Sequence, residues 1–387
     1  MEIKIDERKL LSLATMLVKI PSENPPGNEK KIAGFLASRL REIGFKVFEY
    51  DFKPGRPNVI GRLNFGGGRS LMFDGHLDTV PAGSTDRWST SPFSGEIIHG
   101  KLYGRGAADM KSSIAAWFSA VEAILNADAR LKGEILTCLV SDEEVSGFGT
   151  EDLISKGHVA DMAVVGEPTA LTLQIAHKGV VRWKLSTFGR AAHMSMPKEG
   201  MNAIYKMAKV CQELDRYSKQ LMKKKHILLD SPTIGVGTIK GGEKDNIVPE
   251  YCEASVDRRL IPGEKPEEAE SELIKLLESI KKKDEEFRYK LERYVLLQPS
   301  ETKPDAEIVD IFRRSFRKVT GREPEILGFN ATCEMTHLIR RGIPTVIFGA
   351  GSLNQAHKID EYVYIEEILA ASKIYAESII YALTENS

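Results

Sequence analysis

The chain has 387 residues, of which 42% are hydrophobic and 28% are charged, so it can bury a large core and form two domains. Its 54 basic and 55 acidic residues leave a net charge of −1, which argues against nucleic acid or an anionic membrane as a partner. The four cysteines are scattered and form no Cys-x-x-Cys pair, a pattern typical of free thiols in a reducing cytosol. The sequence shows neither a cleavable signal segment nor the roughly 20 consecutive apolar residues of a membrane span. We therefore expect a cytoplasmic protein that acts on a small molecule or a short peptide.

Helices and strands alternate along residues 1–178. A helix is predicted over residues 29–43, where apolar residues recur every three or four positions and Gly44 can cap the end. Further predicted elements are strands at 58–64, 70–73 and 133–140 and a helix at 110–125. This alternation predicts an α/β fold with a mixed β-sheet flanked by helices, in which ligands bind beyond the carboxyl ends of the strands.

The pattern changes after residue 178. The predicted elements there are strands at 180–188, 233–239 and 250–256 and helices at 201–219 and 266–281, which together describe a compact α+β insertion. After residue 293 the α/β pattern resumes, with helices near 306–318 and 365–383 and a strand at 345–348. We therefore predict a discontinuous first domain, residues 1–178 and 293–387, and an inserted domain, residues 179–292.

Two polar side chains follow the predicted strand at 70–73, in the motif GHLDTVP. His76 and Asp78 are two residues apart, and side chains two apart in a strand point to the same side. An imidazole that binds metal through one nitrogen needs its other N–H held by a neighbouring group, often a carboxylate. We therefore expect His76 to bind a metal and Asp78 to orient it. The glycine-rich motif GRGAADMK presents Asp109 as a further ligand.

Three more acids and a second histidine follow predicted strands. Glu143 and Glu144 stand side by side in SDEEVSGFGT, so one can bind metal while the other stays free as a base. Glu167 lies in VVGEPT, and His357 ends the motif GAGSLNQAH. These positions add to the set of candidate metal ligands at strand ends.

The number of candidate ligands indicates two metal ions. The five candidates are His76, Asp109, Glu144, Glu167 and His357. A catalytic zinc commonly has three protein ligands and an open position for water. Five ligands make two sets of three only if one carboxylate is shared, and Asp109 is the candidate bridge. Two ions held in this way lower the pKa of a water between them.

These motifs, together with GRAAHMSMP at 189–197, occur in the order and spacing of a known family. Over almost its whole length the chain resembles the co-catalytic metallohydrolases that include acetylornithine deacetylases, succinyl-diaminopimelate desuccinylases, aminoacylases and glutamate carboxypeptidases. The resemblance implies a zinc exopeptidase-like catalytic domain with an inserted lid and dimerisation domain.

The resemblance also implies a role for each candidate residue of the metal site. His76 and Glu167 would bind one zinc, Glu144 and His357 the other, and Asp109 would bridge them. Glu143 would be the general base and Asp78 the partner of His76. The peptide bond between Asp109 and Met110 would be cis.

Three residues of the insertion match further functional positions of the family. His193 would reach the active site of the neighbouring subunit in a homodimer and stabilise the oxyanion of the transition state. Arg259 would bind a substrate carboxylate, for which a guanidinium is well suited. Asn246 would face the substrate.

The implied reaction is hydrolysis of a linear amide. Glu143 would deprotonate the attacking water and pass the proton to the departing amine, so that the products are an amine and a carboxylic acid. We expect an N-acyl amino acid as the substrate and zinc as the metal, although cobalt and manganese accept overlapping ligand sets. A metallo-exopeptidase that uses the same site remains the alternative. A relative without catalysis is disfavoured because the base and every ligand position are filled.

One loop departs from the family pattern. Many relatives carry a Thr-Asp or Ser-Asp pair before the last domain helix, where this chain reads NATCEMT from residue 330. Thr332 fits the first position, whereas Cys333 takes the place of the acid. The difference leaves open which acyl group and which amino acid the site accepts.

Overall fold

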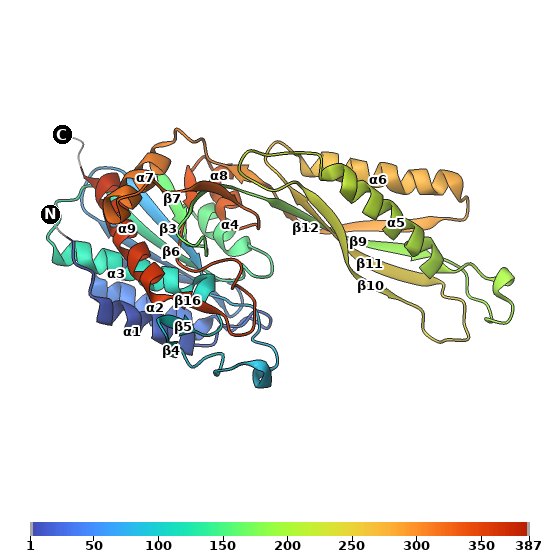
Figure 1. Cartoon of the computed structure of the whole chain (residues 1–387), viewed down its shortest axis with the longest axis horizontal. Coiled ribbons are helices and arrows are strands. Elements are labelled where there is room, and N and C mark those ends of the chain that lie inside the picture. Colours follow the sequence, from blue (N-terminus) through green and yellow to red (C-terminus); the bar gives the residue numbers. More distant parts are fainter. Residues whose placement is uncertain (1–2, 385–387) are drawn as a thin grey trace. The chain divides into compact units, whose positions relative to one another are not determined.

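The computed structural model describes residues 3–384 and separates into two compact units (Figure 1). The first unit comprises the described residues of Met1–Ile175, Thr302–Phe329 and Cys333–Ser387, and the second comprises Ala176–Glu301 and Asn330–Thr332. The boundary that we predicted between residues 292 and 293 falls inside a strand, β12 (Arg288–Leu297), and the second unit continues to Glu301.

A mixed sheet forms the centre of the first unit. Its strand order is β1-β2-β6-β3-β7-β15-β8-β13, and β14 also pairs with β8. The strands β6, β3, β7 and β15 run parallel to one another, whereas β1, β2, β8 and β13 pair with antiparallel neighbours. The strand bounds are β1 (Lys46–Lys53), β2 (Arg56–Asn64), β3 (Ser70–His76), β6 (Glu134–Val140), β7 (Met162–Val165), β8 (Leu173–His177), β13 (Ser300–Glu301), β14 (Ile326–Phe329) and β15 (Thr345–Ile347).

Helices flank this sheet, as the sequence predicts. Their bounds are α1 (Glu7–Lys19), α2 (Lys30–Ile43), α3 (Ser112–Asn126), α4 (Phe148–Ser155), α7 (Glu307–Thr320), α8 (Met335–Arg340) and α9 (Ile365–Leu383). The helix α2 packs on β1 and β2, and α3 lies between α1 and α9. Because α3 is covered on nearly all sides, it is apolar around most of its circumference rather than along one stripe.

Aromatic side chains fill the space between β3, α3 and α9. The ring of Trp117 stacks on Phe73 with a centroid distance of 4.9 Å, and Tyr375 meets both rings edge-on. The indole N–H of Trp117 donates to the hydroxyl of Thr137 at 2.8 Å, so its polar atom is satisfied inside the core. This packing holds α3 and α9 against β3.

A small sheet of β4 (Ile97–Ile98), β5 (Lys101–Tyr103) and β16 (Tyr362–Tyr364) completes the first unit. In the part of the chain that the structure describes, no helix is both long enough and apolar enough to span a membrane.

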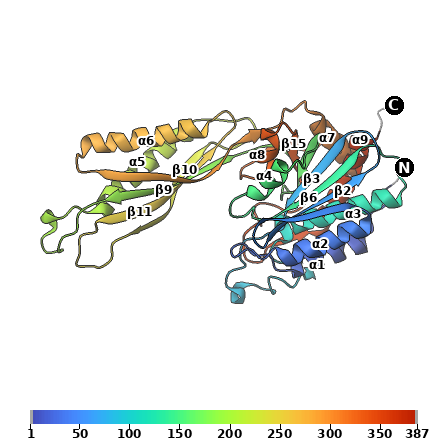
Figure 2. The same cartoon turned by 180° about the vertical axis from the view of Figure 1, so that it is seen from behind.

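The second unit is a four-stranded antiparallel sheet with two helices packed against it (Figure 2). Its elements are β9 (Gly179–Phe188), α5 (Ala203–Leu221), β10 (Thr233–Gly241), β11 (Tyr251–Leu260), α6 (Pro266–Lys283) and β12. Residues of β11 alternate between buried and more exposed positions, and the buried apolar ones join α5 and α6 in one apolar cluster. The unit therefore has a core of its own.

Candidate metal centre

The parallel strands bring the predicted metal ligands to one edge of the large sheet. His76, the last residue of β3, pairs with Val140, the last residue of β6. On the other side of β3, Asp74 pairs with Val165 of β7, so Glu167 follows at the level of His76. Since carboxyl ends of parallel strands meet at the same edge, the segment after Val140 lies there as well.

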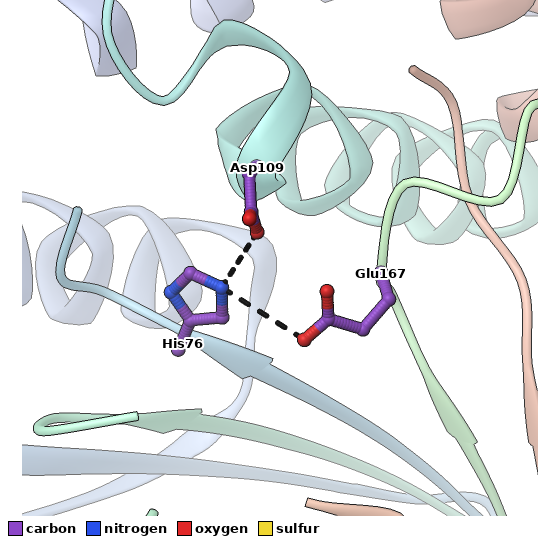
Figure 3. A group of neighbouring side chains, drawn as sticks. All are labelled: His76, Asp109 and Glu167. Atoms are coloured by element: carbon purple, nitrogen blue, oxygen red, sulfur yellow. Dashed lines mark hydrogen bonds and ion pairs between the residues drawn. The ribbon is translucent and has the colours of Figure 1, made fainter. Parts of the chain in front are cut away.

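Three predicted ligands form one compact group (Figure 3). His76 Nε2 lies 2.9 Å from Asp109 Oδ1 and 4.0 Å from Glu167 Oε1. All three residues are buried, with exposed fractions of 1%, 6% and 3%, respectively. Asp109 belongs to a short irregular helix before α3, η2 (Ala107–Lys111), and its peptide bond to Met110 is cis, which confirms that expectation.

A second group shares Asp109 with the first. His357 Nε2 lies 3.3 Å from Asp109 Oδ2 and 3.0 Å from Glu144 Oε2. The two carboxylate oxygens of Asp109 therefore face different imidazoles, one from each group. His357 adopts a positive φ of 64° in the loop after β15.

Both groups have the spacing and chemistry of a zinc-type site. A tetrahedral ion with bonds of about 2.0–2.2 Å holds its ligand atoms roughly 3.4 Å apart. The nitrogen–oxygen distances between His76 or His357 and the carboxylates range from 2.9 to 4.0 Å. Imidazole nitrogen and carboxylate oxygen are also the donor types that such ions accept. The residues present therefore fit a pair of divalent ions that share Asp109.

The electrostatics of the site favour positive charge between the carboxylates. Hydrogen bonds to Asp109 and Glu144 raise the pKa of His357 to about 10. Burial acts to raise the pKa of Asp109, but hydrogen bonds from His357 and His76 hold that pKa below its usual range. A carboxylate that stays ionised although it is buried is well suited to bind cations.

The side chains of Glu361 and Arg105 hold the backbone at Asp109 in place. Glu361 Oε1 accepts hydrogen bonds from the backbone N–H groups of Ala108, at 2.9 Å, and Asp109, at 3.1 Å. Its other oxygen pairs with Arg105 at 2.6 Å, and both side chains are buried. We did not predict Glu361 from the sequence, because no strand or motif pattern marks it.

Glu143 belongs to neither of the two ligand groups, but it lies close to Glu167 of the first. One of its oxygens lies within 4.8 Å of one oxygen of Glu167 and one of Glu334. Burial, followed by the negative charge of Glu334, raises the pKa of Glu143 well above its ordinary value. A carboxyl group with a raised pKa next to the candidate ligands holds a proton more readily than an ordinary glutamate.

Glu334 is an acid of this site that our sequence reasoning missed. We took Cys333 as the residue that replaces the family's acid, but the following residue supplies a buried carboxylate. Glu334 is 1% exposed, and among residues 3–384 neither of its carboxylate oxygens has a hydrogen-bond partner. Burial raises its pKa to about 7. No pattern distinguishes such an acid from a surface glutamate until the loop is placed.

Asp78 contacts His76 through a different atom from the one that we expected. The main-chain carbonyl of Asp78 lies 2.9 Å from His76 Nδ1, whereas the carboxylate oxygen Oδ1 is 3.9 Å away. The carboxylate instead accepts the backbone N–H groups of Glu143, at 3.2 Å, and Glu144, at 3.1 Å. The reason is that β3 ends at His76, so the alternation of a strand does not extend to Asp78.

The three predicted residues of the insertion lie in the second unit. His193 is exposed and its Nδ1 lies 2.7 Å from Ser195 Oγ. It pairs across an isolated bridge with Ile247, next to Asn246. Arg259 lies on β11 and pairs with Asp257 at 2.8 Å. Their roles toward the metal centre of the first unit remain predictions.

Comparisons with known proteins place this geometry in context. Residues 72–381 match the family model described as peptidase family M20/M25/M40. An acetylornithine deacetylase from Myxococcus xanthus is 31% identical over 359 residues, which cover 89% of this chain and 90% of that protein. An N-formyl-4-amino-5-aminomethyl-2-methylpyrimidine deformylase from Bacillus subtilis is 28% identical over 407 residues, covering 97% and 96%.

A solved structure shares the fold. The M20 family metallo-carboxypeptidase Sso-CP2 from Sulfolobus solfataricus superposes with a TM-score of 0.83 at 22% sequence identity, covering 96% of this chain and 98% of that one. The expected fold, a mixed sheet flanked by helices with an inserted lid domain, is thereby confirmed.

Proposed function

Because the chain belongs to peptidase family M20/M25/M40, we propose that it is a two-metal hydrolase that cleaves the amide bond of an N-acyl amino acid. The observation that carries this proposal is the orientation of Asp109, whose two oxygens face the imidazoles of His76 and His357. A carboxylate placed in this way can be shared by two neighbouring metal ions. The similarity to a deacetylase and a deformylase, both of which remove small acyl groups, supports an acyl amide as the substrate.

The proposed ligand sets follow the two groups. His76 and Glu167 hold one ion, Glu144 and His357 hold the other, and Asp109 bridges. We propose zinc, because imidazole and carboxylate suit it, with cobalt as a functional substitute. When bound, such ions polarise an amide carbonyl and lower the pKa of a bound water toward neutrality.

Glu143 is the proposed general base. It receives the proton of the attacking water and delivers it to the departing amine nitrogen, so that one carboxyl group serves both steps. Its raised pKa suits this exchange, because a protonated Glu143 must be stable for the time between the two transfers. The products are a free amine and a carboxylic acid.

The second unit supplies the remaining proposed groups. In a homodimer, His193 of each subunit stabilises the oxyanion in the site of its partner, and its exposure leaves it free to do so. Arg259 binds the α-carboxylate of the substrate, which replaces Asp257 as the ion-pair partner. Asn246 lies beside the segment of His193 and contacts the substrate. All four cysteines are free, which supports a cytoplasmic location.

The test is release of free amine from a panel of N-acetyl, N-succinyl and N-formyl amino acids and dipeptides by protein reconstituted with zinc or cobalt. We expect turnover of acyl amino acids. Cleavage confined to dipeptides would instead assign a metallo-exopeptidase, and no turnover by protein with two bound metals would refute the proposal.

A pair of variants tests the role of the base. Glu143→Gln should abolish turnover and keep both metals, whereas Glu42→Gln, on the exposed end of α2, should change neither. Substantial activity of Glu143→Gln would show that another group moves the proton.

A further inference from the structure

The segment that follows α1 runs beside the chain that leaves β3. The backbone N–H of Asn24 donates to the carbonyl of Thr79 at 2.8 Å, and the N–H of Thr79 donates to the carbonyl of Ser22 at 3.0 Å. Asn24 is 3% exposed. The backbone around Asn24 is therefore tied to the segment that follows β3, independently of any contact of the Asn24 side chain. This residue lies outside the part of the chain, 72–381, that matches the family model.

The amide group of Asn24 joins two buried carboxylates. Its Nδ2 lies 2.8 Å from Asp78 Oδ2 and 3.0 Å from Asp142 Oδ1. Ionised carboxylates only accept hydrogen bonds, so the NH₂ group and not the oxygen of Asn24 must face them. Each of its two hydrogens then has one carboxylate as its partner.

Both carboxylates belong to the support of the segment that carries the proposed base. The carboxylate of Asp78 accepts the backbone N–H groups of Glu143 and Glu144, and Asp142 is the residue directly before them. The backbone of Asp142 has a positive φ of 73°, a conformation that is uncommon for residues other than glycine. The side chain of Asn24 therefore connects Asp78, which binds this backbone, to Asp142, which belongs to it.

The link extends outward to the ion pair of Arg56, which is partly buried, with Glu29, which is buried. Arg56 lies 3.0 Å from Asp142 Oδ1 and forms a two-fold hydrogen-bonded pair with Glu29. Gly27 packs against the Arg56 guanidinium so closely that an added Cβ would lie 2.7 Å from its atoms. Gly27 and Glu29, which lie between Asn24 and α2, thus both contact Arg56. Arg56 in turn contacts Asp142, so this segment and Asp142 are held together.

We propose that Asn24 is a positioning residue that fixes the Glu143–Glu144 backbone through Asp78 and Asp142, and so sets the direction of the base and of one metal ligand. Its role in turnover rests on the proposed function, whereas its role in ordering the segment does not. An aspartate at this position would place a third carboxylate against the other two and could not donate, while an alanine would leave both without this donor.

Backbone hydrogen exchange of the metal-free protein tests the proposal without substrate. In Asn24→Ala, the amides of residues 142–148 should exchange at least tenfold faster than in the wild type. The control is Thr302→Val, which removes a buried hydroxyl that bonds the backbone of Thr345 at the start of β15, away from the ligand edge. The control should leave exchange of residues 142–148 unchanged. Equal exchange of this segment in Asn24→Ala and the wild type would overturn the proposal.

A second variant covers the case in which Asn24→Ala does not fold. Asn24→Ser keeps one donor, so it should speed exchange of the same segment less than alanine does, and no change would again overturn the proposal. In turnover, Asn24→Ala should lower kcat about 10- to 100-fold, the range seen for groups behind a metal site, with KM changed less than threefold. A fall in kcat no larger than that of Thr302→Val would contradict the positioning role. If the wild type hydrolyses no amide, the proposed function fails and the exchange result still decides the inference.

Discussion

Acid should destabilise the first unit through a single buried histidine. His337 lies on α8 with 4% of its surface exposed, and its ring lies against Phe148. Burial, followed by the positive charge of Arg340, lowers the pKa of His337 to about 4 from an ordinary value of 6.5. Protonation therefore favours the unfolded state, in which the ring is free to take up a proton. The loss of stability begins near pH 6.5 and is complete below about pH 4.

The structure gives a magnitude for this effect. At about 1.4 kcal/mol per pKa unit, the gap between 6.5 and about 4 amounts to about 3 kcal/mol when fully expressed. Between pH 7 and pH 5 the linkage relation yields about 2 kcal/mol of lost unfolding free energy. His337 lies on α8, which begins directly after Glu334. The helix that loses stability in acid is therefore next to the candidate metal centre.

Urea unfolding of the metal-free protein at pH 7 and pH 5 measures the effect. The wild type should lose about 2 kcal/mol more than His337→Asn over this interval. The matched control is His99→Asn, an exposed position with a φ of 49° that asparagine accepts. It should follow the wild type at both pH values. If His337→Asn shows the same pH dependence as the wild type, the reasoning about this buried ring is refuted.

Two further predictions concern the second unit. His193→Ala should slow turnover strongly without loss of metal, and mixing it with Glu143→Gln should restore part of the activity, since a mixed dimer then holds one intact site; no recovery would argue against sites shared between subunits. Arg259→Met should raise KM about 10- to 100-fold for substrates with a free α-carboxylate and leave their amidated counterparts unchanged, as steady-state kinetics on matched pairs will show. An equal loss on both substrates would place Arg259 outside the carboxylate site.

The sequence sufficed to place three of the proposed ligands at the ends of apolar strands. His76 is the last residue of β3, Glu144 and Glu167 follow β6 and β7, and the parallel order of these strands brings the three residues together. Such runs are recognisable because strands buried on both faces are continuously apolar. The helix α9 was also predicted, since its apolar residues recur with helical spacing.

Three buried polar residues around the candidate ligands could not be predicted from the sequence, for a physical reason. Asn24, Glu334 and Glu361 lie close to residues far away in the chain; Asn24 and Asp142, for example, are 118 positions apart. Their local sequence resembles that of an ordinary loop, so only the folded structure brings them to the site. The predicted boundary at residue 292 falls inside β12, a strand that shows no regular alternation of buried and exposed residues.

The sequence also could not predict which atom of Asp78 contacts the His76 imidazole. Two-residue spacing predicts a common side only while the strand continues, and β3 ends at His76 itself. Asp78 consequently offers its carbonyl to the imidazole and its carboxylate to the backbone of Glu143 and Glu144.

Zinc binding to the metal-free protein, followed by equilibrium dialysis, tests the central claim most directly. Two ions that share Asp109 predict two zinc ions per wild-type chain and loss of tight binding of both in Asp109→Asn. Asp128→Asn, an exposed position with a φ of 51°, is the matched control and should still bind two. A wild-type chain that binds one ion, or an Asp109→Asn chain that binds two as tightly as the wild type, would contradict a shared two-metal centre.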